Sequence, residues 1–240
     1  MTRPRAVLLD ALGTLLELEP PWPLLRAQLA ARGVEVTDGE ARAALRAEIA
    51  YYRAHHDDAV DGAALDDLRD RCAAVLGAAL PPHARAAPDL RGALLASLRF
   101  RPYGEVPAVL AALREQGLRL VVVSNWDVSL HEALAATGLA GLVDGAISSA
   151  EAGAAKPDPA IFARALALAG VPAADALHVG DSPEADVAGA RAAGIRALLV
   201  VRDGASASAA DAGDQRARPG AIADLRGVLD ALGPYRPSCR

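Results

Sequence analysis

The chain has 240 residues, 52% of them apolar and 3% aromatic, and a net charge of −5 at pH 7. This length suits one domain of ordinary size, or a core domain with a smaller insertion. The acidic balance argues against a general nucleic-acid surface and against an anionic-membrane surface, whereas a phosphate site would need only a local positive pocket.

The start of the chain and its cysteines indicate the compartment. Basic residues precede a short apolar run that ends at Asp10, which is too short for a secretory signal. The two cysteines, Cys72 and Cys239, are too few and too far apart to indicate a disulfide framework or a zinc site. No segment has the apolar length of a membrane span. We therefore expect a cytoplasmic protein with no membrane partner, either a monomer or a homodimer.

Short apolar runs bounded by turn-forming or polar residues predict buried parallel strands, and helical stretches lie between them. The predicted strands are Ala6–Leu9, Leu118–Val123, Ala176–Val179 and Ile195–Val201, with a weaker fifth at Gly145–Ser148. The predicted helices are Val106–Gln116, Leu130–Thr137, Pro159–Leu168, Glu184–Ala193 and Ala221–Leu232. Three of them precede glycines at positions where helices commonly end, namely Gly117, Gly138 and Gly194. The alternation predicts an α/β fold, a Rossmann-like doubly wound parallel sheet with helices on both faces.

The alternation is interrupted once, because the pattern is helical throughout from Leu18 to Leu98. We interpret this stretch as an inserted helical cap at residues 18–98, and residues 1–17 and 99–240 as the core domain. A later stretch, Gly204–Pro219, is rich in alanine, serine, glycine and aspartate, which predicts an exposed loop.

Polar residues follow three of the predicted strands directly. Asp10 follows the first, Ser124 the second and Asp181 the third, and Lys156 lies between the weak strand and the next helix. Ligands of an open parallel sheet bind outside the carboxyl ends of its strands, so these four side chains are expected at one edge. Lys156 is also the single lysine against twenty-four arginines, which suggests a role for a compact point charge.

The chemistry of this set is that of a phosphate site. Asp10 and Asp181 would repel each other unless a hard cation lay between them, and Mg²⁺ takes such oxygen ligands together with phosphates. Lys156 adds positive charge. Gly13 lets the backbone approach an anion, so that its amide and that of Thr14 can point at a phosphoryl group. Asp10 is then an available nucleophile.

The ordered motifs resemble those of the haloacid dehalogenase-like hydrolase superfamily, in the branch with a helical cap inserted after the first motif. Arg101–Pro107 resembles the return from cap to core, and the resemblance covers nearly the whole chain. The four motifs are Val7–Leu15, Val122–Asn125, Lys156–Phe162 and His178–Ala190.

The resemblance implies a role for each matching residue. Asp10 is expected to be the nucleophile that forms an aspartyl-phosphate, and Lys156 to neutralise charge between it and the phosphate. Ser124 and the backbone of Asn125 are expected to hold the phosphoryl oxygens. The implied metal is Mg²⁺, and its expected ligands are Asp10, Asp181, Asp186 and the backbone carbonyl of Leu12.

The side chain of Leu12 departs from the pattern of the family's phosphatases, which carry a second aspartate there. That aspartate protonates the leaving oxygen and later activates water, and leucine can do neither. General acid–base assistance contributes roughly 10²–10⁴-fold, so the loss is severe for alkyl phosphates and mild for aryl or acyl phosphates. His55, His56, Asp57 and Asp58 are candidates for a substitute acid, although such a cluster is more often a solvated helix end.

Three interpretations remain. The first is a Mg²⁺-dependent phosphatase for a small phosphorylated metabolite, slow or restricted to good leaving groups. The second is a 2-haloacid dehalogenase, which needs no metal and typically carries tyrosine where Leu12 stands. The third is a binding or regulatory protein on a weakened hydrolase scaffold. Against it stand five intact site residues, Asp10, Ser124, Lys156, Asp181 and Asp186.

Overall fold

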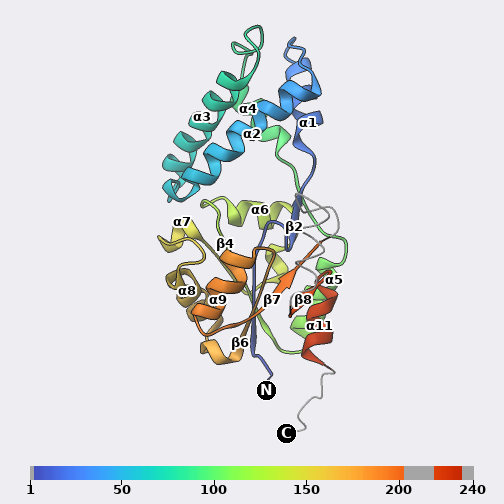
Figure 1. The fold of residues 1–240 in the computed structure, drawn as a ribbon, viewed down its shortest axis with the longest axis vertical. Coiled ribbons are helices and arrows are strands. Elements are labelled where there is room, and N and C mark those ends of the chain that lie inside the picture. The colour runs from blue at the N-terminus through green and yellow to red at the C-terminus, as the bar shows by residue number, and fades with distance from the viewer. Residues whose placement is uncertain (1–2, 203–218, 234–240) are drawn as a thin grey trace. The chain divides into compact units, whose positions relative to one another are not determined.

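The computed structural model describes residues 3–202 and 219–233 (Figure 1). It divides into two compact units: an α/β unit and a helical unit. The predicted loop at 204–219 lies outside the described residues except for Pro219, and Cys239 also lies outside them. The α/β unit comprises Met1–Glu17, Pro102–Asn125 and Leu130–Arg240, and the helical unit comprises Leu18–Arg101 and Trp126–Ser129.

A six-stranded parallel sheet forms the centre of the α/β unit, in the order β5-β4-β1-β6-β7-β8. β1 is wholly buried and lies between β4 and β6. Later strands are added on both sides of it, β5 beyond β4, and β7 and β8 beyond β6. The predicted α/β class is confirmed, and all five predicted strands are present. The strands of this sheet are β1 Ala6–Leu9, β4 Arg119–Ser124, β5 Gly145–Ser148, β6 Ala176–Gly180, β7 Arg196–Val200 and β8 Ala221–Ile222.

Helices cover this sheet because its residues alternate between two apolar faces. On one face, Ala6 and Leu8 of β1 pack with Ile161 and Phe162 in a buried cluster. The helices of the unit are α5 Val106–Glu115, α6 Leu130–Ala136, α7 Ser149–Ala152, α8 Pro159–Ala169, α9 Gly189–Ala192 and α11 Arg226–Leu232. Shorter helical turns are Ala140–Leu142, Ala173–Asp175 and the π-helical Pro183–Ala188.

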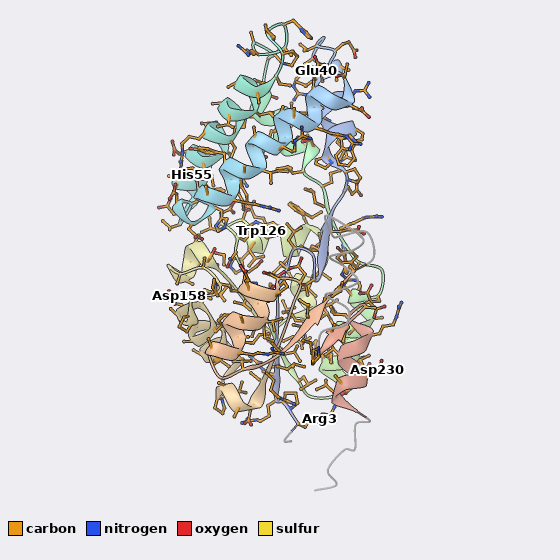
Figure 2. All side chains as sticks on the ribbon, viewed as in Figure 1. Arg3, Glu40, His55, Trp126, Asp158 and Asp230 are labelled. Atoms are coloured by element: carbon orange, nitrogen blue, oxygen red, sulfur yellow. The ribbon has the colours of Figure 1, made fainter. Side chains whose placement is uncertain are left out.

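The ends of these helices follow local chemistry. The side chain of Asp158, labelled in Figure 2, accepts a hydrogen bond of 2.8 Å from the Ala160 amide at the start of α8. Gly117, Gly138 and Gly194 each have positive φ, as predicted for residues that end helices. Glycine adopts this left-handed conformation without a Cβ clash, which is why the sequence reveals these ends.

The prediction of a helix from Ala221 to Leu232 is wrong at its beginning. Ala221–Ile222 is strand β8, and the helix begins only at Arg226. The amide of Val201 donates to the Ile222 carbonyl at 2.9 Å, and β8 pairs in parallel with β7 as the last strand of the sheet. Pairing with a distant strand therefore overrides the local helical pattern.

The helical unit has its own apolar core, built from leucines and alanines of four helices. Helix α2 begins with a capping box, in which Thr37 and Glu40 (Figure 2) each bind the other's backbone amide. The helices are α1 Pro21–Ala30, α2 Asp38–His55, α3 Gly62–Ala79 and α4 Leu90–Ser97, with a 3₁₀ turn at His56–Asp58. Across residues 3–202 and 219–233, none of the helices has the combined length and apolar character of a membrane span.

A separate two-stranded sheet pairs β2 (Leu16–Leu18) with β3 (Phe100–Pro102). Both strands contain a point where the chain passes from one unit to the other. They were not predicted, since three residues are too few to show an alternating pattern.

Candidate active site

Three neighbouring strands bring the predicted polar residues to one edge of the sheet. Asp10 follows β1, Ser124 ends β4 and Asp181 follows β6. The amide of Asp10 donates to the Val179 carbonyl at 2.9 Å, which extends the pairing of β1 with β6 to the first site residue. Parallel register therefore places these residues together, as expected.

Lys156 lies between two of the carboxylates. Its Nζ is 2.6 Å from Oδ1 of Asp10 and 2.6 Å from Oδ1 of Asp186, and all three side chains are buried. Ser124 donates its hydroxyl to the same Oδ1 of Asp10 at 3.0 Å. One oxygen of Asp10 is therefore held by two donors.

A third carboxylate joins this pair. Asp10, Asp181 and Asp186 each offer an oxygen, and these oxygens lie within 4.8 Å of one another. With one lysine among them, the group carries a net negative charge. Three carboxylates at this spacing fit a divalent cation with oxygen ligands such as Mg²⁺.

The pKa values within the cluster follow from burial and charge. Burial raises the pKa of Asp10, and Lys156 opposes the rise. For Asp186, burial acts in the same direction, but Lys156 and the hydrogen bond from His178 prevail and hold its pKa well below the usual range. The chain atoms packed around the Asp181 carboxylate raise its pKa to about 7, and repulsion from Asp10 and Asp186 adds to the rise. A cation bound beside Asp181 would relieve that repulsion.

Gly13 is required where the turn after Asp10 meets Asp181. Its φ is +87°, and a Cβ placed there would lie 2.1 Å from Oδ2 of Asp181. Gly180 has the same function on the other side, since a Cβ there would lie 2.1 Å from Cγ of Asp186. Gly180 was not singled out from the sequence, because a glycine at the end of a strand is usually only a turn residue.

The amides of Gly13 and Thr14 have partners inside the turn. Gly13 donates to the Leu16 carbonyl at 2.8 Å, and Thr14 donates to the Ala11 carbonyl at 3.3 Å. These bonds shape the backbone after the nucleophile. Binding of a phosphoryl group by the same amides stays a prediction.

Asn125 has a role that its position in the sequence did not reveal. Its side chain donates to the Lys156 carbonyl at 2.9 Å and accepts from the Lys156 amide at 2.7 Å. This reciprocal pair fixes the backbone of the lysine loop beside the end of β4. The prediction assigned only the backbone of Asn125 to phosphate binding, and the structure adds the side-chain contact.

His178 contacts a carboxylate of the same motif. Its Nε2 lies 2.9 Å from Oδ1 of Asp186, while Phe162 packs edge-on with 5.2 Å between ring centroids. The partner was not predicted, since eight residues separate the two side chains and the π-helical turn at Pro183–Ala188 brings them together. His178 therefore orients a predicted metal ligand.

The side chain of Leu12 is 39% exposed. A leucine at this position has no group that could give or take a proton. The turn after Asp10 therefore carries no acid or base at position 12, where the family's phosphatases have an aspartate.

Comparison with known proteins agrees with this geometry. Residues 4–194 match the family model described as haloacid dehalogenase-like hydrolase. The chain belongs to this family of hydrolases.

Individual relatives match over shorter stretches. The chain is 46% identical over 93 residues to haloacid dehalogenase-like hydrolase domain-containing protein 3 of Bos taurus, covering 39% of this chain and 37% of that protein. It is 43% identical over 105 residues to phosphoserine phosphatase of Thermus thermophilus, covering 43% of this chain and 42% of that protein. The chain thus spans about two fifths of the length of these curated relatives.

Comparison of structures gives matches that cover nearly the whole chain. A solved L-2-haloacid dehalogenase superposes with a TM-score of 0.66 at 26% identity, and the match covers 96% of this chain and 99% of that one. Solved structures named as a phosphatase and as a dehalogenase both share this fold.

Proposed function

We propose that the protein is a Mg²⁺-dependent phosphatase that acts on a small phosphorylated metabolite through an aspartyl-phosphate on Asp10. The observation that carries the proposal is the buried contact of Lys156 with Asp10 and Asp186, with Asp181 completing an acidic group within 4.8 Å. The relative named as a phosphoserine phosphatase supports phosphate esters as the substrate class. We also propose that the helical unit is the cap of this family's fold and that the protein is cytoplasmic.

In this proposal Asp10 attacks the phosphorus atom. Lys156 and Ser124 both bind Oδ1 of Asp10, which leaves Oδ2 free of these two donors to act as the nucleophile. The new bond from oxygen to phosphorus forms while the bond to the leaving oxygen breaks, and the leaving group takes the electron pair. Water then hydrolyses the acyl phosphate, releasing phosphate and restoring the carboxylate.

Lys156 favours the ionised form of Asp10 against the effect of burial and holds Oδ1 in place for this attack. Burial alone would lower the pKa of the ammonium group, but the neighbouring carboxylates raise it above the usual range. The lysine is therefore a permanent positive charge that stabilises the charge of a transferring phosphoryl group. Mg²⁺, held by Asp10, Asp181, Asp186 and the Leu12 carbonyl, would add further charge stabilisation when bound.

Leu12 limits the substrates. Without a side chain that can protonate the leaving oxygen, the reaction depends on the leaving group's own stability. Aryl and acyl phosphates satisfy this condition, whereas alkyl phosphates form a strongly basic alkoxide. We expect turnover of p-nitrophenyl phosphate and acetyl phosphate to exceed that of alkyl phosphates.

A panel of phosphoesters with good and poor leaving groups tests the proposal. Activity is expected to require Mg²⁺, to vanish in EDTA and to return when Mg²⁺ is restored. Robust turnover in EDTA would contradict the metal assignment. No turnover of any phosphate, with or without Mg²⁺, would favour a binding or regulatory protein instead, for which Leu12 is the supporting observation.

A second candidate is dehalogenation, which the whole-chain likeness to an L-2-haloacid dehalogenase favours. Against it, Asp181 and Asp186 form an acidic group that a metal-free reaction would not need. Halide release from 2-chloropropionate decides between the two chemistries, and we expect none.

A further inference from the structure

A buried arginine binds the turn that follows the nucleophile. Arg202 comes shortly after β7 and is 7% exposed. Its Nε donates to the Gly13 carbonyl at 3.2 Å, and its Nη2 donates to the Thr14 carbonyl. The planar fork of a guanidinium suits two neighbouring acceptors of this kind.

Arg202 is itself held in place within the α/β unit. Its Nη1 lies 2.9 Å from Oε1 of Glu105, and both side chains are more than nine-tenths buried. Its guanidinium carbon lies 3.4 Å from the centroid of the Tyr103 ring, in a cation–π contact. The amide of Tyr103 donates to the Leu15 carbonyl at 3.1 Å, so one of the two residues that hold the arginine also contacts the turn.

The contacts of the turn determine where the Leu12 carbonyl points. A peptide unit is planar, so a partner that fixes its N–H also fixes the carbonyl on its opposite side. The N–H of the unit between Leu12 and Gly13 belongs to Gly13 and donates to the Leu16 carbonyl at 2.8 Å. That bond directs the Leu12 carbonyl away from Leu16.

The next two peptide units depend on Arg202. It binds the carbonyl of each unit, those of Gly13 and Thr14. The N–H groups of the same units belong to Thr14 and Leu15, and both donate to the Ala11 carbonyl, at 3.3 and 2.8 Å. Three successive peptide units are thus fixed, two of them by the arginine.

We propose that Arg202 is a positioning residue for the divalent-cation site. It holds two carbonyls of the turn and thereby stabilises the orientation of the adjoining Leu12 carbonyl, an expected metal ligand. Because Gly13 packs directly against the Asp181 carboxylate, a shift of the turn would also displace that ligand. The inference rests on the proposed cation site and adds a residue that lies 189 positions from the turn.

Two variants separate positioning from simple stability. Arg202→Lys keeps a positive charge near Glu105 but cannot bind both carbonyls with one planar group. The double variant Arg202→Met with Glu105→Gln removes both charges, so it leaves no buried charge without a partner. Arg119→Lys is the control, because its ion pair with Asp144 lies at the opposite end of β4.

Three measurements are made on the full chain: Mn²⁺ affinity by electron paramagnetic resonance titration, hydrogen exchange of amides 13–16, and the thermal midpoint. Arg202→Lys is expected to weaken Mn²⁺ binding about tenfold, the loss typical of outer-shell partners of a metal site. It is also expected to speed exchange of the turn amides. The double variant should have a thermal midpoint close to that of the unaltered chain but a weaker Mn²⁺ affinity. The control should match the unaltered chain in all three measurements.

The outcomes are distinguishable. A double variant with unaltered Mn²⁺ affinity and turn protection would overturn the role of Arg202. Absence of Mn²⁺ binding to the unaltered chain would overturn the cation site and, with it, the proposed function. If the double variant does not fold, Arg202→Lys decides, since unchanged affinity and exchange in that variant would also overturn the proposal.

Discussion

The two units of this protein both bury acidic side chains, but with different partners. In the α/β unit, Asp10 and Asp186 share the ammonium group of Lys156. In the helical unit, Glu48 of α2 is 3% exposed, and its pKa is raised to about 7 by burial, with only a hydrogen bond to Cys72 to oppose the rise. Among the residues that the structure describes, no basic group contributes to that shift.

A second acid of the helical unit is also paired with a neutral group. The Tyr52 hydroxyl donates to Oδ2 of Asp127 at 3.0 Å, and burial followed by the charge of Asp127 raises the pKa of Tyr52. Oδ1 of Asp127 accepts from the Ser129 amide at 2.7 Å, a local bond just before helix α6.

This difference separates chemistry from stability. A lysine beside a buried carboxylate favours the ionised form, which can act as a nucleophile or a metal ligand, whereas a carboxylate among apolar and neutral groups tends to become neutral. We therefore expect substitutions in the first cluster to change activity strongly, and substitutions in the second to change mainly the pH dependence of folding.

The largest effect is expected from Asp10→Asn. The substitution removes the nucleophile but keeps the shape of the side chain, and Lys156 retains Asp186 as a partner. Turnover of p-nitrophenyl phosphate should fall at least about 10³-fold, with little change in the thermal midpoint. Activity close to that of the unaltered chain would show that the cluster is not catalytic.

Lys156→Met tests the charge compensation itself. It leaves Asp10 and Asp186 buried without their cation, which should lower the free energy of unfolding by roughly 3–5 kcal/mol. Urea unfolding in EDTA measures this loss. The matched control is Arg119→Met, whose more exposed ion pair should contribute about 1 kcal/mol or less. Equal losses in both variants would mean that Lys156 stabilises the fold no more than the cation of a partly exposed ion pair does.

Glu48→Gln tests the uncompensated acid. Because the folded pKa of about 7 exceeds the ordinary 4.5, the folded chain binds more protons than the unfolded chain between these values. Stability should therefore fall as the pH rises from about 4.5 to 7, by about 3 kcal/mol in total. Asp181, whose pKa is also raised to about 7, contributes a fall over the same interval. In Glu48→Gln the fall should therefore be smaller by the part that Glu48 contributes, as measured by urea unfolding across the pH range. An unchanged pH profile would mean that Glu48 does not titrate in this interval.

The smallest expected effect is a gain, from Leu12→Asp. A carboxyl group there could protonate a leaving oxygen, so hydrolysis of alkyl phosphates should rise about tenfold relative to that of p-nitrophenyl phosphate. The ratio of kcat/KM for the two substrates measures it. A uniform change in both would argue against a missing leaving-group acid.

Much of the fold follows from local pattern. β1 and β5 are short apolar runs that match their predicted bounds, and the glycines after the helices have the expected positive φ. β8 could not be predicted, because Ala221–Ile222 is extended only through its pairing with β7. The short strands β2 and β3 depend on each other in the same way.

The candidate site divides along the same line. Asp10, Ser124, Lys156 and Asp181 follow from their place at strand ends, since the register of parallel strands carries them to one edge. The side chains that hold these residues in place could not be predicted from the spacing of residues along the sequence. Asn125 binds the backbone of Lys156, His178 binds Asp186, and Arg202 binds the turn at Gly13.

The amino-acid order alone thus determined the class of fold and which residue types stand at the ends of the strands, because periodicity and turn chemistry act between near neighbours. Only the tertiary structure decided which oxygens Lys156 shares and which groups hold the turn. Several of those contacts join residues more than a hundred positions apart, as in the bonds from Lys156 to Asp10 and from Arg202 to Gly13, and no local pattern records them.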